Sequence, residues 1–234
     1  MRIIIIILIR YINIIIMFNN DNPKTNGENN FFMNIKDKIE VIFDVGCRTD
    51  SEFSLFEGKV HYFDPINEFI ETLKTQQNNN TLSYFNNFGL GNENKEIYYY
   101  PRYQSFYNRI KSCNVNDDPN KILLHIKKAN DYIVTNNIKN ISFLKIDTEG
   151  YELDVLQGFE DKLEIVNIIQ FEYGGTFLDN NIKLIDVINY LKQKGFYKFS
   201  YLTNIEPQLI TDFNDHYQYC NIVCLNNKSD YIPF

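Results

Sequence analysis

The chain has 234 residues, 44% of them hydrophobic and 15% aromatic, which is enough for one α/β domain with a full core. Its formal net charge is -7 and it shows no basic stripe, so we expect no nucleic-acid partner. The four cysteines form no CxxC pair and no paired framework, which excludes a disulfide scaffold and favours a reducing, cytoplasmic location.

The amino end is unusual, because residues 3–18 are almost all isoleucine, interrupted by Arg10 and Asn13. A spanning helix needs about 20 apolar residues with few charges, and a signal peptide ends in small residues that this run lacks. Three interpretations stay open: a membrane anchor, an extra element packed on the domain, and a poorly ordered extension. Membrane contact through this run is not the favoured one.

A polar stretch follows over residues 19–30 and contains Pro23 and Gly27, which is typical of a linker. We therefore divide the chain into an isoleucine-rich extension with its linker, residues 1–32, and a folded domain, residues 33–234.

Apolar runs alternate with helical or connecting segments along the domain, which predicts a parallel sheet covered on both faces. The expected strands are 41–44, 59–63, 82–86, 141–146 and 166–172, followed by a closing antiparallel pair, 196–202 and 219–225. The expected helices are a short one over 51–58, one after Pro65, an amphipathic one over 121–136, and two over 152–159 and 182–194. The tyrosine-rich segment 98–120 is either a cap over a binding site or a surface loop.

The most informative stretch is the apolar run 141–146, which ends in Asp147, Glu149 and Glu152 before a helical pattern begins. A buried strand that delivers acids to the carboxyl edge of a parallel sheet has this pattern, and ligands bind at that edge. Glu172 ends the next expected strand in the same way. The alternative interpretation is a strand end that carries solvated acids.

The first two expected strands also end in acids. Asp44 is followed by Gly46, whose backbone can approach a ligand closely. Asp64 lies about twenty residues further on, where an acid accepts hydrogen bonds from ribose hydroxyls; its alternative role is a helix N-cap ahead of Pro65. No G-x-G-x-x-G motif and no P-loop is present, so an adenosine-type cofactor without a pyrophosphate fits best.

Together these blocks resemble the FkbM family of S-adenosylmethionine-dependent methyltransferases. The matching pieces are Val41–Gly46, Tyr62–Pro65, Asn87–Gly91, Ala129–Tyr132, Phe143–Glu152, Val155–Gly158 and Gln170–Glu172. The resemblance covers roughly residues 38–225, and Phe143–Glu152 is its specific part. It implies a Rossmann-like class I methyltransferase fold, with a seven-stranded, mostly parallel α/β sheet and an antiparallel edge strand. It also implies O-methylation, often on sugars or natural products.

The resemblance implies cofactor-binding roles for four residues. Asp44 and Gly46 would line the methionine part of S-adenosylmethionine, Asp64 would hold the ribose, and Asn87 or its neighbours would approach the adenine. The family usually has a second glycine where this chain has Asp50. A carboxylate there would repel the carboxylate of the cofactor.

Methyl transfer from a sulfonium to an oxygen needs positioning and a base for the hydroxyl proton. Asp147 is the predicted base or orienting group, and Glu149 and Glu172 are the further catalytic candidates. Converging carboxylates can also hold a divalent cation, but no histidine joins them and we assign no metal. The predicted substrate is a hydroxyl of a sugar, glycan or small natural product. The alternative, which Asp50 favours, is an inactive methyltransferase-fold domain with a binding or structural role.

Overall fold

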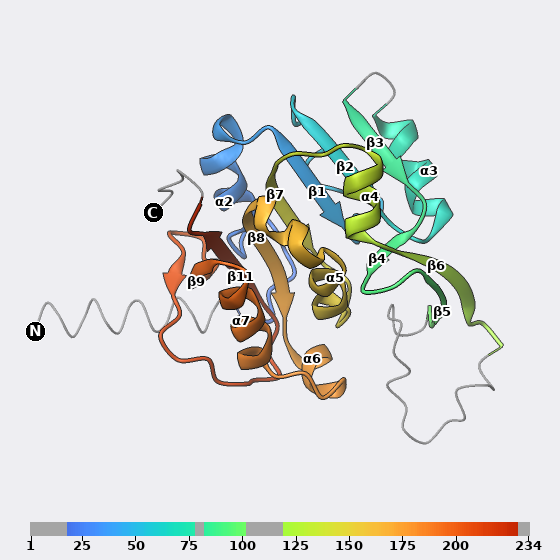
Figure 1. Cartoon of the computed structure of the whole chain (residues 1–234). Helices are drawn as coiled ribbons and strands as arrows, with labels where there is room; N and C mark the ends of the chain where they lie inside the picture. The colour runs from blue at the N-terminus through green and yellow to red at the C-terminus, as the bar shows by residue number, and fades with distance from the viewer. Residues whose placement is uncertain (1–17, 78–81, 102–118, 229–234) are drawn as a thin grey trace, which may run out of the picture.

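The computed structural model describes residues 18–77, 82–101 and 119–228 (Figure 1). Its centre is a sheet of eight strands in the order β10-β9-β11-β8-β7-β1-β2-β3. The strands are β1 (Val41–Val45), β2 (Lys59–Phe63), β3 (Ser83–Asn86), β7 (Ile141–Ile146), β8 (Val166–Tyr173), β9 (Phe196–Tyr201), β10 (Gln208–Leu209) and β11 (Cys220–Asn226). The neighbours β8, β7, β1, β2 and β3 are parallel.

The predicted α/β architecture with a mostly parallel sheet is therefore confirmed, with eight strands instead of seven. The closing strands β9 and β11 pair antiparallel as expected. However, β11 lies between β8 and β9, and the two-residue β10 occupies the edge.

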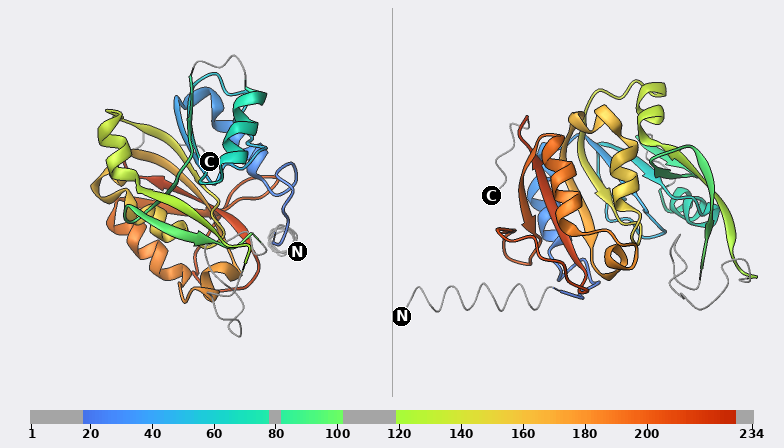
Figure 2. Two further views of the ribbon diagram at one scale, coloured as in Figure 1. Left: turned by 90° about the vertical axis from the view of Figure 1, so that its right-hand side faces the viewer. Right: turned by 60° about the horizontal axis from the view of Figure 1, so that its bottom comes forward.

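Helices cover both faces of this sheet (Figure 2). The helices are α2 (Glu28–Ile35), α3 (Asn67–Gln76), α4 (Ala129–Thr135), α5 (Glu152–Gly158), α6 (Gly175–Asp179) and α7 (Leu184–Gln193), with 3-10 turns at Lys36–Lys38 and Glu160–Ile165. Successive strand residues pack into hydrophobic clusters on opposite faces of the sheet. Phe43 and Leu144 pack with α4, α5 and α7, whereas Ile42 and Phe143 pack with α2 and α3. Burial on both faces explains the nearly continuous apolar runs in the sequence.

A second, three-stranded sheet in the order β4-β6-β5 packs beside α5. It consists of β4 (Gly89–Gly91), β5 (Lys95–Tyr99) and β6 (Ile122–Lys128). The prediction of an amphipathic helix over 121–136 is therefore wrong. The first part of this segment is strand β6, and only the second part, α4, is helical. Leu124 and Ile126 are buried at the two-residue spacing of a strand, and the pairing with β4 and β5 decides the structure.

The connection from β1 to β2 differs from expectation as well. Residues 51–58 form turns and not a short helix. Phe53 and Phe56 are buried in the core on the α2 and α3 face, and they fix this connection against the sheet.

The amino-terminal part of the domain begins before the predicted boundary at residue 33. Helix α2 spans that boundary and buries Phe31, Phe32 and Ile35 in the core. Gly27 precedes it with φ 101°, and a Cβ at this position would lie 2.6 Å from the carbonyl oxygen of Thr203. Residues 1–17, which carry most of the isoleucine run, lie outside the described residues. Within the described part of the chain, no helix has the length and apolar character needed to cross a membrane.

Candidate active site

The carboxyl ends of four adjacent parallel strands bring the predicted acids to one edge of the sheet. In the order β8-β7-β1-β2, these strands deliver Glu172, Asp147, Asp44 and Asp64. Gly46 follows β1 directly. Two adjoining cavities open at this edge, and both are lined by Gly46, Arg48, Asp147 and Glu149.

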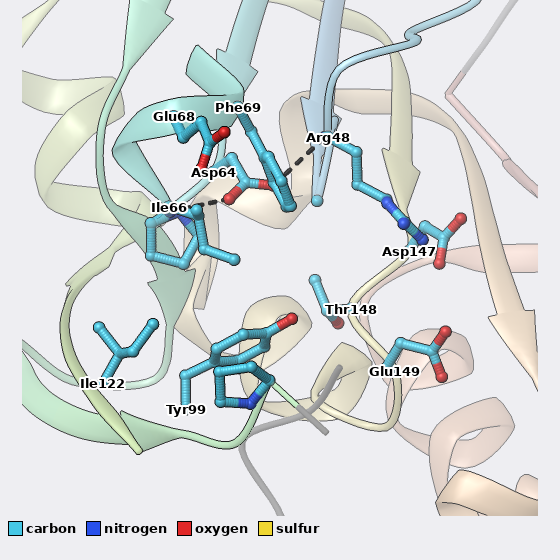
Figure 3. Close-up of a pocket in the computed structure, with 13 residues that line it drawn as sticks. Arg48, Asp64, Ile66, Glu68, Phe69, Tyr99, Ile122, Asp147, Thr148 and Glu149 are labelled. Carbon is cyan, nitrogen blue, oxygen red and sulfur yellow. Dashed lines mark hydrogen bonds between the residues drawn. The ribbon is translucent and has the colours of Figure 1, made fainter. Parts of the chain in front are cut away.

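The first cavity, which we call the Asp64 cavity, has a volume of about 310 Å³ (Figure 3). The Asp64 carboxylate accepts hydrogen bonds from the backbone N–H groups of Ile66, at 2.8 Å, and Arg48, at 3.2 Å. It therefore braces the turn before α3 as well as lining the cavity. Asp64 is not the N-cap of that helix, because α3 begins at Asn67 with Ile66 as its N-cap, so the alternative role predicted from the sequence is wrong. Burial raises the pKa of Asp64 to about 6.

The opposite wall of the Asp64 cavity is apolar and partly aromatic. Tyr99, Pro101 and Ile122, at the ends of the β5–β6 ribbon, form it, whereas Ile66 and Phe69, at the start of α3, add apolar surface beside Asp64 (Figure 3). Of the predicted cap segment 98–120, Tyr99 and Pro101 therefore line the cavity, and residues 102–118 lie outside the described part. A flat apolar group fits between such walls, next to an acid that accepts hydrogen bonds.

The second cavity, the Lys145 cavity, has a volume of about 340 Å³ and is strongly acidic. Among the described residues, two cations line it, Arg48 and Lys145, against eight acids: Asp21, Glu28, Asp44, Asp50, Glu52, Asp147, Glu149 and Glu172. Such an excess of carboxylates favours ligands that carry positive charge.

Lys145 lies on the floor of this cavity and is ion-paired. Its Nζ lies 3.1 Å from Glu28 Oε2, on α2, and 3.9 Å from Glu52 Oε1. Burial by itself lowers the pKa of Lys145, but the neighbouring carboxylates of Glu52 and Glu28 hold it well above the usual range. Lys145 thus stays charged. Its partner Glu28 belongs to the segment that was expected to be a linker.

Gly46 lines both cavities, whereas Asp44 lines the Lys145 cavity. Asp44 is buried and accepts a hydrogen bond from Ser51 Oγ at 2.5 Å, and burial raises its pKa to about 6. Gly46 has φ 83°, and a Cβ at this position would lie 1.9 Å from the carbonyl oxygen of Asp147. Any side chain at residue 46 would therefore separate β1 from β7 where the cavities meet.

Three of the predicted acids converge. Carboxylate oxygens of Asp147, Glu149 and Glu172 all lie within 4.8 Å of one another. Burial, and secondarily the repulsion from Asp147, raises the pKa of Glu172 well above its usual range. Burial also raises the pKa of Asp147, against the lowering effects of Lys145 and Arg48. In Figure 3 the Arg48 side chain extends toward Asp147.

Asn87 takes a different position from the other predicted residues. Its Nδ2 donates hydrogen bonds to the backbone carbonyls of Asp64, at 3.3 Å, and Pro65, at 3.0 Å. It does not line the Asp64 cavity but supports the turn that carries Asp64.

Sequence reasoning missed Arg48, Glu28 and Glu52, which line the cavities. Glu28 had a readable signal, because Phe31, Phe32 and Ile35 follow it at helical spacing.

Comparison with known proteins decides the family. The family model for the methyltransferase FkbM domain matches residues 44–198, about two thirds of the chain. The chain belongs to the FkbM methyltransferase family. The enzyme class and the cofactor implied by the sequence, a methyltransferase that uses S-adenosylmethionine, are thereby confirmed.

No curated protein matches the FkbM chain in sequence. Among solved structures, it is similar to a Streptococcus mutans protein in complex with SAH (12% identity, 86% of this chain and 97% of that chain, TM-score 0.46). It is also similar to a SAM-dependent O-methyltransferase from Thermotoga maritima (10% identity, 88% of this chain and 66% of that chain, TM-score 0.44). A third similar structure is the Methanococcus jannaschii fibrillarin pre-rRNA processing protein (8% identity, 89% of this chain and 77% of that chain, TM-score 0.49). Likenesses this distant do not bear on the substrate.

The two cavities of the FkbM domain fit the cofactor chemically. Asp64 offers acceptor oxygens beside apolar walls, which suits a ribose and a base. The acidic Lys145 cavity, which Asp44 lines, suits an ammonium group and a sulfonium, and Gly46 leaves room for a ligand to approach the backbone.

Glu152 supports the loop between the cavities and predicts a pH dependence of stability. Its Oε1 accepts hydrogen bonds from Thr148 N, Thr148 Oγ1 and Gly150 N, while its buried Oε2 has no hydrogen-bond partner. Burial raises its pKa from 4.5 to about 7. The folded state therefore binds this proton more tightly than the unfolded state, so stability is present at low pH and is lost as pH rises toward and past 7.

Glu152→Gln keeps the acceptor oxygen and removes the titration. We expect the thermal midpoint of the wild type to fall by several degrees between pH 5.5 and 8, and the variant to show a shallower fall. Part of the slope should remain, because Asp44 and Asp64 also have a pKa raised to about 6. Circular dichroism melts at the two pH values measure this, and equal slopes for both proteins would contradict it.

Proposed function

We propose that this FkbM methyltransferase transfers a methyl group to a hydroxyl of a sugar, glycan or other small molecule. The observation that carries the proposal is the position of Asp147, at the junction of a cavity suited to the cofactor nucleoside and a second, acidic cavity with room for an acceptor. The cavities total only a few hundred Å³, which is the size range of small-molecule sites.

The cofactor roles follow from the same arrangement. S-adenosylmethionine supplies an electrophilic methyl group on a sulfonium. Asp64 binds the ribose hydroxyls, Ile66 and Phe69 pack on the base, and Asp44 with Gly46 receives the methionine part. Asn87 acts indirectly, by fixing the Asp64–Pro65 backbone.

Asp147 takes the proton from the acceptor hydroxyl in this proposal. Asp147 lies beside Gly46, which supports a role next to the methionine part of the cofactor. Its pKa, raised by burial, makes it a better base than a solvated carboxylate. Glu149 and Glu172 orient the acceptor from the same side.

The decisive experiment follows labelled methyl groups. Purified enzyme is incubated with S-adenosylmethionine carrying a ¹³C-methyl group and with fractionated small molecules and glycans from a cell extract. The proposal requires a product whose new carbon resonance lies in the O-methyl range. A product with an N-methyl group, or label found only in RNA, would overturn it.

Asp64→Ala tests the ribose assignment. Removal of a charged hydrogen-bond acceptor should weaken S-adenosylmethionine binding by about 1.5–3 kcal/mol, roughly tenfold or more. Calorimetry with a folded variant measures this, and Asp186→Asn on the exposed side of α7 serves as the control with unchanged affinity. Wild-type affinity in Asp64→Ala would remove Asp64 from the cofactor site.

A further inference from the structure

The methionine end of S-adenosylmethionine carries an ammonium group and a carboxylate, and these two groups need opposite partners. The Lys145 cavity suits the ammonium far better than the carboxylate, because eight acids line it against two cations among the described residues. Asp50 is one of these acids, and it would repel the cofactor carboxylate. A cation along the path of the cofactor would offset that repulsion.

The positions of the two cations separate them. Among the described residues, Arg48 is the cation that lines both cavities. Lys145 lies on the floor of its own cavity, with its Nζ 3.1 Å from Glu28 Oε2, and does not line the Asp64 cavity. A cofactor with its ribose at Asp64 and its methionine part in the Lys145 cavity therefore passes Arg48.

The backbone of Arg48 has a conformation that an arginine adopts at a cost. Its φ of 51° lies in the left-handed region, which favours glycine, and its N–H donates a hydrogen bond to Asp64 Oδ2 at 3.2 Å. In Figure 3 the side chain extends from this turn toward Asp147 and away from Asp64. A strained backbone that directs a charged side chain to the boundary of two cavities is typical of a ligand-binding position.

The charge of Arg48 acts on carboxyl groups on both sides of this boundary. Burial raises the pKa of Asp64 and the pKa of Asp147, and Arg48 opposes the rise at each of them. The guanidinium is therefore within electrostatic reach of the acid assigned to the ribose and of the acid assigned to the reacting methyl group. The methionine part of the cofactor lies between these two positions in the proposed arrangement.

We propose that Arg48 binds the methionine carboxylate of S-adenosylmethionine. A guanidinium can donate two parallel N–H hydrogen bonds to a carboxylate, and the surrounding acids then serve the ammonium and the sulfonium. Arg48 precedes Asp50 by two positions in the same turn, so its positive charge offsets the repulsion that Asp50 exerts. The inference concerns the cofactor and does not depend on the identity of the acceptor.

Calorimetry on the full chain with three ligands tests the proposal. S-adenosylmethionine and S-adenosylhomocysteine carry the carboxylate, whereas decarboxylated S-adenosylmethionine lacks that group alone. Arg48→Gln keeps the backbone N–H that Asp64 accepts. It should weaken binding of the two carboxylate ligands by about tenfold or more, the scale for a hydrogen bond between charged groups. Binding of the decarboxylated ligand should stay within about twofold or become tighter, because the variant removes a like charge.

Two further variants complete the test. Arg48→Lys restores the charge without the planar fork, so its affinity for the carboxylate ligands should lie between wild type and Arg48→Gln. Lys74→Gln is the matched control, because it also removes one positive charge, from an exposed pair with Glu71 in the last turn of α3. Its affinity for all three ligands should equal that of the wild type.

Two results would overturn the proposal. Equal weakening of all three ligands by Arg48→Gln would mean that Arg48 only supports the turn after β1. Unchanged binding of the two carboxylate ligands would mean that other groups, such as backbone amides, hold the carboxylate. Neither result bears on the labelling experiment, which identifies the atom that accepts the methyl group.

Discussion

Replacing Glu28 with glutamine should lower the free energy of unfolding by about 3 kcal/mol, the scale for breaking a buried ion pair from one side. The Glu28 side chain is 9% exposed and its partner Lys145 is 16% exposed. Besides Lys145, the carboxylate accepts hydrogen bonds from Asn26, Asn221 and Gln170. The side-chain NH₂ of a glutamine would face the amide N–H donors of these residues. It would also leave the Lys145 charge without its nearest carboxylate.

The pH dependence of this difference has a defined sign. Burial by itself raises the pKa of Glu28, but Lys145 and the amide donors hold it below 4.5. A carboxylate with a lowered pKa contributes stability above its unfolded pKa and loses it as pH falls through the folded value. Urea unfolding at pH 7 should therefore separate the variant from wild type fully, and the gap should narrow in acid.

A surface pair provides the matched control. Glu164 and Lys228 lie 2.8 Å apart with side chains 52% and 62% exposed, so Glu164→Gln should change stability by less than about 1 kcal/mol. If Glu28→Gln is equally mild, the Glu52 carboxylate, 3.9 Å from Lys145, is sufficient as a partner.

The same contacts determine what truncation does. A chain that begins at Met33 would lack Glu28, Phe31 and Phe32, which the sequence assigned to the linker side of the boundary. Phe31 and Phe32 are buried, so this truncation removes core as well as the ion pair.

The parallel part of the fold was predictable because its signal is local. Each central parallel strand is a mainly apolar run, and four of them end in or beside an acid at the edge where ligands bind. The small sheet was not predictable in this way. Ile122, Ile126, Ala129 and Ile133 fit helical spacing, and only the pairing of β6 with strands β4 and β5 makes the first half extended.

The residues of the candidate site also differ in whether the local sequence predicts their position. Asp44, Gly46, Asp64, Asp147 and Glu172 were readable because strand ends carry them. Arg48 was not predictable, since its place depends on its own left-handed backbone conformation, with φ 51°, in the turn that follows β1. Asn87 could be assigned to the neighbourhood of the site, but its contact with the Asp64 backbone comes from tertiary packing.

Asp147→Asn should reduce turnover by about 10²-fold or more, the scale for loss of a general base, with little change in S-adenosylmethionine affinity. Asparagine keeps the shape of the side chain and removes the basic oxygen. The Asp147 carboxyl lies next to the predicted methionine site but outside the hydrogen bonds of Asp64. The rate of methyl transfer should therefore fall, while cofactor affinity should stay close to that of the wild type.

The measurement compares kcat and cofactor affinity on the acceptor identified by the labelling experiment. Asp186→Asn, an exposed change on α7, should keep the wild-type rate. A variant with near-normal kcat would refute the role of Asp147 and move the base to Glu172, whose pKa is also raised by burial. Partial recovery of the lost turnover with added Mg²⁺ or Ca²⁺ would show instead that Asp147 acts mainly by holding a divalent cation, because only weakened ion binding responds to concentration.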